Sequence, residues 1–185
     1  GKKLSNNLKD KLKNDLTVIV YNFVDMLSHS KTEMEIIKEL ASNDKGYRSL
    51  TLSWFKNSPL FEIIRKGHEY GFKLVITTDH GTINVKNPSK IIGNRETSQN
   101  LRYKTGRSLT YNNKEVVSYE NPNDIFLPNI SINSSYIFAK ENTYLVYPNN
   151  YNYYVNFFRD TYQHGGISLE EIIIPYVVLM PKIKK

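Results

Sequence analysis

Two short apolar segments constrain the fold of this chain more than any other feature. They read LTVIVYNFV at residues 16–24 and FKLVITT at residues 72–78. A continuous run of apolar and β-branched residues is typical of a strand that is buried on both faces of a sheet. The residues between the two runs have helical periodicity, so the order is strand, helices, strand. This order predicts a right-handed βαβ unit in a parallel sheet.

Helix signals lie before, between and after these runs. Ser58 and Pro59 have the chemistry of an N-cap and a first helical residue, and Gly71 stops the helix that they open. A second signal is the capping box of Thr32 and Glu35. The expected helices cover residues 2–15, 32–41, 46–56, 59–70 and 149–158.

The second half of the chain is less regular. Residues 81–128 are rich in Asn, Ser, Thr and Gly and have poor periodicity, which predicts a long irregular segment. The runs at 135–140 and 143–147 predict a β-hairpin. A capping box at Ser168 opens a short helix, and a last strand lies within residues 172–180.

Composition bounds the class of protein. The chain has 185 residues and a mass of 21.6 kDa, which suits one domain or a piece of a larger one. It has no cysteine, which excludes disulfides, Cys-ligated zinc and a thiol nucleophile. No apolar run approaches the roughly 20 residues of a membrane span. No apolar leader follows the lysine-rich N-terminus. We therefore expect a cytoplasmic protein that does not contact a membrane.

The positive charge is concentrated at the two ends. The net charge is +7, of which residues 1–15 and residues 182–185 each contribute +3. The part between them is nearly neutral, so the high isoelectric point is weak evidence for nucleic acid. We expect an entry segment or linker at residues 1–16, a domain at residues 17–181 and a basic tail at residues 182–185.

Acidic and histidine residues follow both apolar runs. Asp25 and His29 are four residues apart, so they share one face if this turn is helical and can then bind one cation. The alternative is a surface pair or a cap. Asp79 and His80 end the second run, and Gly81 permits a tight turn after them. The alternative here is an N-cap followed by an ordinary loop histidine.

The other two histidines differ in context. His164 stands in a QHGG loop before a helix start, and its paired glycines allow the backbone to approach a ligand closely. The alternative is a glycine-rich loop that holds an incidental histidine. His68 lies within the expected helix 59–70, and we expect it on the surface.

Two further clusters are candidates for binding. The segment 86–107 is strongly basic, and Arg side chains with nearby hydroxyls suit a phosphate-bearing substrate; the alternative is a solvated loop. Its basic residues are Lys86, Lys90, Arg95, Arg102, Lys104 and Arg107. An aromatic cluster at residues 151–162 suits base stacking, or packing in the core as the alternative.

Three ordered motifs carry a family resemblance. They are NFVDMLSH at residues 22–29, VITTDHGT at residues 75–82 and QHGGISLEE at residues 163–171. Together they resemble the C-terminal half of a PglZ domain, a branch of the alkaline phosphatase superfamily, over roughly residues 17–181. The resemblance implies an α/β fold with three layers and a mostly parallel central sheet. Since the chain also begins with Gly, we expect a fragment of that fold.

The resemblance also implies a two-metal site, with zinc as the usual ion. Asp25, His29 and His164 would bind one metal, and Asp79 and His80 the other. Ligands of nitrogen and oxygen alone also allow manganese or iron. The superfamily's Thr or Ser nucleophile precedes the first motif, so this chain alone would be inactive.

The family activity implied is phosphodiester hydrolysis. The substrate would be an oligonucleotide, whose repeated phosphates suit the basic segment. The residues expected to bind it are Arg95, Arg102, Lys104 and Arg107.

Three further sequence segments resemble one kind of PglZ protein. They comprise SLTLSWF at residues 49–55, TSQNLRYK at residues 97–104 and YENP at residues 119–122. They are similar to PglZ domains that are joined to a response-regulator receiver domain, in two-component systems that control type IX secretion. The implied partners are proteins of that signalling or secretion system, and a homodimer. The alternative is a non-catalytic regulatory interaction module of the same fold.

Overall fold

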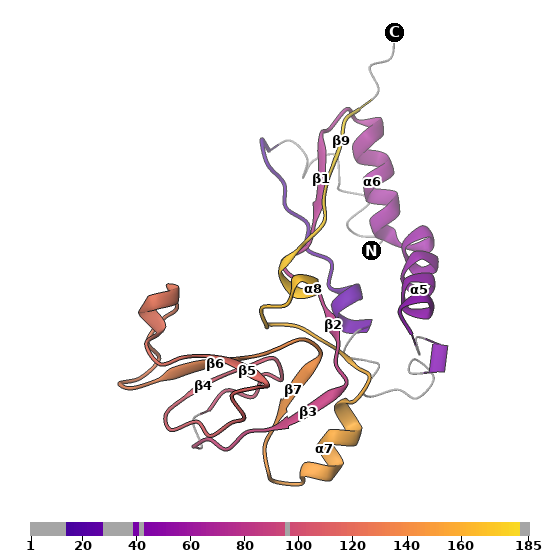
Figure 1. The fold of residues 1–185 in the computed structure, drawn as a ribbon. Coiled ribbons are helices and arrows are strands. Elements are labelled where there is room, and N and C mark those ends of the chain that lie inside the picture. Colours follow the sequence, from indigo (N-terminus) through magenta and orange to yellow (C-terminus); the bar gives the residue numbers. More distant parts are fainter. Residues whose placement is uncertain (1–13, 28–38, 41–42, 95–96, 182–185) are drawn as a thin grey trace. The chain divides into compact units, whose positions relative to one another are not determined.

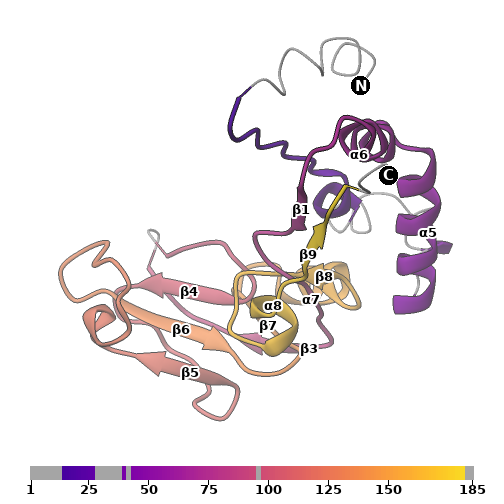
Figure 2. The same cartoon turned by 90° about the horizontal axis from the view of Figure 1, so that it is seen from above.

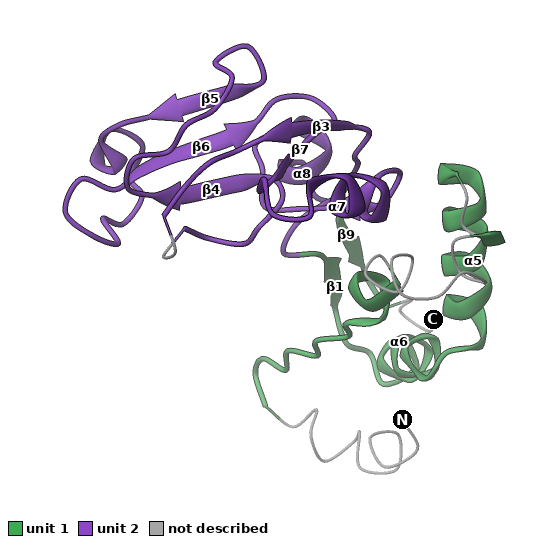
Figure 3. Ribbon diagram, turned by 90° about the horizontal axis from the view of Figure 1, so that it is seen from below, with its two compact units in different colours: residues 1–78, 175–185 green, residues 79–174 purple. Residues whose placement is uncertain are grey.

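The computed structural model describes residues 14–27, 39–40, 43–94 and 97–181 of the chain (Figure 1). The chain forms two compact units, shown in different colours in Figure 3. Unit 1 comprises Gly1–Thr78 and Pro175–Lys185, and unit 2 comprises Asp79–Ile174. Several sequence predictions lie outside the described residues. They are the helix at 2–15, most of the helix at 32–41, His29, Arg95 and the tail at 182–185.

Both helices expected at residues 46–56 and 59–70 of unit 1 are present, and the signals at Ser58 and Gly71 mark the second one. Helix α5 spans Asp44–Asn57, and the side chain of Asn43 accepts a hydrogen bond from the Gly46 N–H at its start. Helix α6 spans Pro59–Glu69, with Ser58 as the N-cap. It stops before Gly71, whose φ of 82° lies in the left-handed region that favours glycine.

The sheet of unit 1 is a two-stranded antiparallel ribbon. Strand β1 (Leu74–Thr77) pairs with strand β9 (Tyr176–Leu179), and the two lie side by side in Figures 1 and 2. The Thr77 hydroxyl also donates a hydrogen bond of 2.8 Å to the Pro175 carbonyl. The predicted last strand is therefore present, and it pairs with the second apolar run.

The first apolar run is not the buried strand that its composition predicts. Residues 16–20 belong to no strand, and Leu16, Val18 and Val20 are 79%, 76% and 79% exposed. A strand needs a pairing partner as well as β propensity, and β1 instead pairs with the C-terminal strand. The predicted parallel βαβ unit is therefore absent from the described residues. A mostly parallel central sheet is also absent there, because the described strands form four small sheets.

Unit 2 contains most of the described strands, within the segment predicted to be irregular and beyond it. Strand β6 (Ser135–Ala139) pairs antiparallel with both β4 (Tyr103–Gly106) and β5 (Val116–Tyr119), as Figure 2 shows. Strand β3 (Asn87–Lys90) pairs in parallel with β7 (Thr143–Val146). A 3₁₀ turn at Pro122–Ile125 follows β5.

The predicted hairpin at residues 135–147 is half correct. Both strands form, and the turn between them is closed by a 3.0 Å hydrogen bond from the Thr143 N–H to the Lys140 carbonyl. The two strands do not pair with each other, however, because β6 joins β4 and β5 while β7 joins β3. The residues of the turn determine where the chain reverses between β6 and β7. Contacts with strands from elsewhere in the chain determine which strands pair.

The described residues of unit 2 pack into two apolar clusters. One comprises Ile91, Val116, Ile137, Ala139 and Leu145. The other comprises Ile83, Val85, Tyr144 and Val146. Helix α7 (Tyr151–Phe158) packs Tyr151 and Phe158 against the second cluster, so part of the aromatic cluster is core.

None of the described helices is both long enough and apolar enough to cross a membrane.

Candidate metal centre

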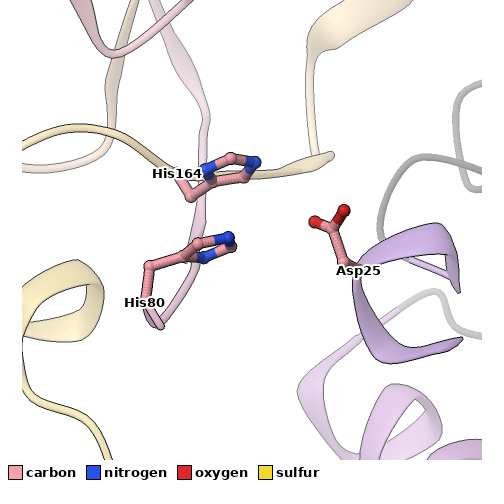
Figure 4. Close-up of side chains that lie close together, drawn as sticks. All are labelled: Asp25, His80 and His164. Carbon is pink, nitrogen blue, oxygen red and sulfur yellow. The ribbon is translucent and has the colours of Figure 1, made fainter. Parts of the chain in front are cut away.

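Two histidines far apart in sequence meet in unit 2. Strand β2 (Ile83–Asn84) pairs antiparallel with strand β8 (Tyr162–Gln163), with Ile83 opposite Gln163. The residues just before β2 and just after β8 are therefore neighbours, which brings His80 beside His164. Their rings are stacked, with centroids 3.8 Å apart and an angle of 9° between the planes (Figure 4).

The hydrogen bonding of His80 leaves one ring nitrogen suited to a metal. Its Nδ1 lies 3.0 Å from the Gly81 carbonyl oxygen, which only accepts, so Nδ1 carries the proton. The lone pair is then on Nε2, the arrangement usual for metal-binding histidines. Ring nitrogens of His80 and His164 lie within 4.8 Å of each other. That spacing suits one shared ion or two neighbouring ions.

Helix α8 (Leu169–Ile172) holds the turn that carries His80. The Gly81 N–H donates a 2.8 Å hydrogen bond to the Glu171 carbonyl. A Cβ at position 81 would collide with the Glu170 carbonyl oxygen, so only glycine fits this approach. The glycine predicted to permit a tight turn therefore serves a close contact between two backbones.

The Glu171 side chain holds the loop that carries His164. Its carboxylate accepts hydrogen bonds from the Gly166 N–H at 2.9 Å and the Ser168 N–H at 3.1 Å. The predicted capping box at Ser168 and Glu171 is present. Asn100 adds a third support, since its side-chain amide donates to the His164 carbonyl at 3.3 Å. One acidic residue thus fixes both loops, through its backbone and its side chain.

A buried ion pair in turn holds Glu171. Arg102 Nε and Nη2 each lie 2.9 Å from a Glu171 carboxylate oxygen, and both side chains are closed to solvent. Arg102 also donates to the carbonyls of Thr143 and Ala139. Burial alone would raise the pKa of Glu171, but hydrogen bonds and charge from Arg102 outweigh it and hold that pKa below its usual value.

Comparison with protein families decides what kind of domain this is. The sequence matches the family described as the BREX system PglZ alkaline phosphatase-like domain over residues 1–179. The chain belongs to the PglZ family. An alkaline phosphatase-like domain acts on phosphoesters and uses divalent metals, and the His80–His164 pair offers nitrogen ligands for such an ion. No curated protein matches the chain.

The other predicted ligands of this PglZ domain have different placements. Asp25 belongs to unit 1, is half-buried and lies on a helical turn at residues 23–27. His29 lies outside the described residues, so the face that it would share with Asp25 stays a prediction. Asp79 is 90% exposed, with its Oδ1 3.8 Å from His80 Nε2. His80 and His164, which the resemblance gave to two different metals, are the pair that unit 2 brings together. His68 is exposed on α6, as predicted.

The residues predicted to bind substrate also differ from one another. Arg107 is exposed, and its Nε donates to the Ser131 hydroxyl at 3.2 Å. Lys104 is buried. Arg102 is closed to solvent and its guanidinium is occupied by Glu171, so the prediction that Arg102 contacts substrate is corrected to a structural role. Sequence reasoning missed this role because residues 102 and 171 show no pairing signal along the chain.

Proposed function

We propose that this chain is the metal-binding part of a PglZ phosphodiesterase. The observation that supports it most is the stacked pair of His80 and His164 within a family that acts on phosphoesters. A bound divalent ion, for which zinc is our choice, would supply Lewis-acid stabilisation of charge on a phosphoryl oxygen. His80 Nε2 and a ring nitrogen of His164 would hold it, and Asp25, His29 and Asp79 are the further ligands that the family motifs supply.

The residues of the chain itself would orient these ligands. The Gly81 carbonyl keeps the proton of His80 on Nδ1, and the Glu171 carboxylate holds the Gly166 and Ser168 N–H groups behind His164. In this proposal the Thr or Ser nucleophile of the family lies upstream of this fragment, as the order of the family motifs implies. The chain would then bind metal without turning over substrate.

An oligonucleotide is the substrate that we propose. Arg107, which is exposed, and Arg95 come from the basic segment that the sequence singles out. The longer protein would be a cytoplasmic response regulator of the PorX type, which joins a receiver domain to the PglZ domain and controls type IX secretion. The sequence segments at residues 49–55, 97–104 and 119–122 support the proposal of a PorX-type protein.

The test is hydrolysis by the longer protein that carries this domain. We expect zinc-dependent cleavage of bis(p-nitrophenyl) phosphate and of a short oligonucleotide. His80→Ala and His164→Ala should each lower kcat/KM at least about 100-fold, as loss of a metal ligand does. His68→Ala, on the exposed face of α6, is the matched control and should leave it unchanged. Metal binding without hydrolysis of either substrate would contradict the proposal.

One observation favours a second candidate, a regulatory module that binds protein partners. Unit 1 exposes apolar side chains on Leu16, Val18 and Val20, and along both strands of the β1–β9 ribbon. Exposed apolar surface of this kind marks interaction sites, and an open sheet edge can pair with a second copy of the chain. Light scattering after size exclusion tests it. A dimer that Val18→Lys converts to a monomer supports a homodimer interface, and a monomeric wild type contradicts one.

A further inference from the structure

A pocket of about 580 Å³ lies in unit 2, between β7 and helix α7. Two features that the sequence shows separately meet in it. Lys104 comes from the basic segment, and Tyr154 and Phe158 come from the aromatic cluster. The volume is within the usual range for small-molecule sites, roughly 300–1,000 Å³. The metal-binding histidines do not line this pocket.

Lys104 is the unusual residue of the pocket. It stands on β4, opposite Ile137 of β6, and its side chain is only 1% exposed. A lysine is rarely buried to this extent without an acidic partner. Its Nζ lies 4.3 Å from the centroid of the Tyr147 ring, a cation–π contact. Burial lowers the pKa of Lys104 to about 8, so the amine still carries its charge at neutral pH.

The charge of Lys104 is not neutralised within the part of the chain that the structure describes. The ion pairs found there do not involve it. No acidic side chain of the described residues lines the pocket either. A buried lysine that lines a pocket and has no acidic partner among the described residues is suited to receive an anion from outside.

The remaining walls decide what else the ligand carries. Two of the neighbouring hydroxyls are already engaged. The Tyr147 hydroxyl donates to the Ser98 carbonyl at 2.7 Å, and the Thr97 hydroxyl donates to the Asn94 side chain at 3.0 Å. The Lys104 ammonium is therefore the main group for an anion. The rings of Tyr154 and Phe158 offer aromatic surface to an aromatic body.

We propose that this pocket binds a phosphate-bearing aromatic ligand of the nucleotide class. The phosphate lies at Lys104 and the base lies against Tyr154 and Phe158. The metal-binding histidines take no part, so the proposal stands or falls independently of the hydrolytic function and needs no metal.

Calorimetric titration of the metal-free 185-residue chain tests the ligand class. The probes are adenosine 5′-monophosphate, adenosine and inorganic phosphate. We expect the monophosphate to bind at least about tenfold more tightly than either part alone, because the cation and the rings act on one molecule. Equal affinity for adenosine would overturn the role of the anion. Equal affinity for inorganic phosphate would overturn the role of the rings, and no binding would overturn both.

Matched variants test the residues. Lys104→Met should weaken binding of the monophosphate about tenfold or more, since it removes a charge-assisted hydrogen bond. Lys90→Met is the control, because Lys90 also lies over a tyrosine ring, 5.0 Å from that of Tyr151, but is exposed and outside the pocket. It should bind as the wild type does. An unchanged affinity in Lys104→Met, or an equal loss in Lys90→Met, would overturn the assignment.

A second pair of variants tests the aromatic wall. Tyr154→Ala should weaken the monophosphate roughly fivefold or more through lost stacking. Tyr153→Ala, at the neighbouring exposed position of α7 that does not line the pocket, should not. Equal effects of the two substitutions would contradict a stacked base.

Discussion

The guanidinium of Arg102 and the carboxylate of Glu171 form a bidentate ion pair that is closed to solvent. Both N–O distances are 2.9 Å, and the residues are 69 positions apart in sequence. The same carboxylate accepts the N–H groups of Gly166 and Ser168, which follow His164. The pair therefore positions one of the two histidines of the candidate metal centre.

Breaking this pair should destabilise unit 2 strongly. Glu171→Gln keeps the shape of the side chain but leaves the buried Arg102 charge uncompensated, and such changes cost about 3–5 kcal/mol. Glu170→Gln is the matched control, because Glu170 is exposed on the same helix. It should change the free energy of unfolding by less than about 0.5 kcal/mol. Urea unfolding measures both, and equal free energies for the two variants would contradict the role of the pair.

Acid should weaken unit 2 through the same carboxyl group. Burial raises the pKa of Glu171, but Arg102 more than offsets this, so the folded pKa lies below the ordinary value of 4.5. The pKa of Glu171 is therefore lower in the folded chain than in the unfolded chain. Its carboxylate stabilises the fold fully at pH values above the unfolded-state pKa, and this stabilisation is lost as the pH falls through the folded-state pKa. Between about pH 5 and pH 3, urea midpoints of the wild type should fall more steeply than those of Glu171→Gln. Parallel slopes would refute this.

The buried charge of Lys104 should destabilise the fold at neutral pH. Its pKa is lowered from 10.5 to about 8, so the penalty for burying the charge is complete below about pH 8 and fades as pH rises toward 10.5. Lys104→Met should therefore raise the free energy of unfolding by about 3 kcal/mol at pH 7 and by about half of that near pH 9.5. Lys90→Met should raise it at neither pH. A destabilised Lys104→Met would contradict the account.

Gly81→Ala should disturb the metal centre through the backbone. The added methyl group meets the Glu170 carbonyl, so the turn that carries His80 must move away from α8. We expect lower thermal stability and zinc affinity reduced about tenfold or more, as when the support of a ligand is lost. Gly71→Ala is the comparison: open space surrounds that methyl group, and the strain of its positive φ costs only about 1 kcal/mol. It should leave zinc affinity unchanged, and equal losses of zinc affinity would contradict the prediction.

Local signals in the sequence predicted the parts of this fold that depend on neighbours along the chain. The start of α6 at Ser58 and Pro59 and the capping box at Ser168 follow from hydrogen bonds within one helical turn. The strands β1 and β9 follow from runs of β-branched residues. These elements need no knowledge of distant partners.

Pairing between distant segments was harder to predict. The run at residues 16–24 has the composition of a buried strand, yet residues 16–20 belong to no strand and are largely exposed. The two strands of the expected hairpin form but choose other partners. The β propensity of a segment shows that it can adopt the strand conformation. Which strands pair depends on which segments lie next to each other in the folded chain.

The candidate site also has residues that local motifs predict and one residue whose role depends on a distant partner. The motif residues His80 and His164 could be singled out by their loops, and the structure brings them together. The charge of Arg102 and its neighbouring hydroxyls predict that it binds phosphate. Only the fold reveals Glu171 as its partner, since an ion pair over this separation leaves no periodic pattern.

Metal content tests the central claim most directly. The folded chain, dialysed against zinc-containing and then metal-free buffer without chelator, should retain about one equivalent of zinc in elemental analysis. His164→Ala should lose it, whereas His68→Ala should retain it because that histidine is exposed on α6. A folded wild-type chain without zinc, or a His164→Ala variant that retains as much zinc as His68→Ala, would contradict the assignment of His80 and His164 as the metal centre.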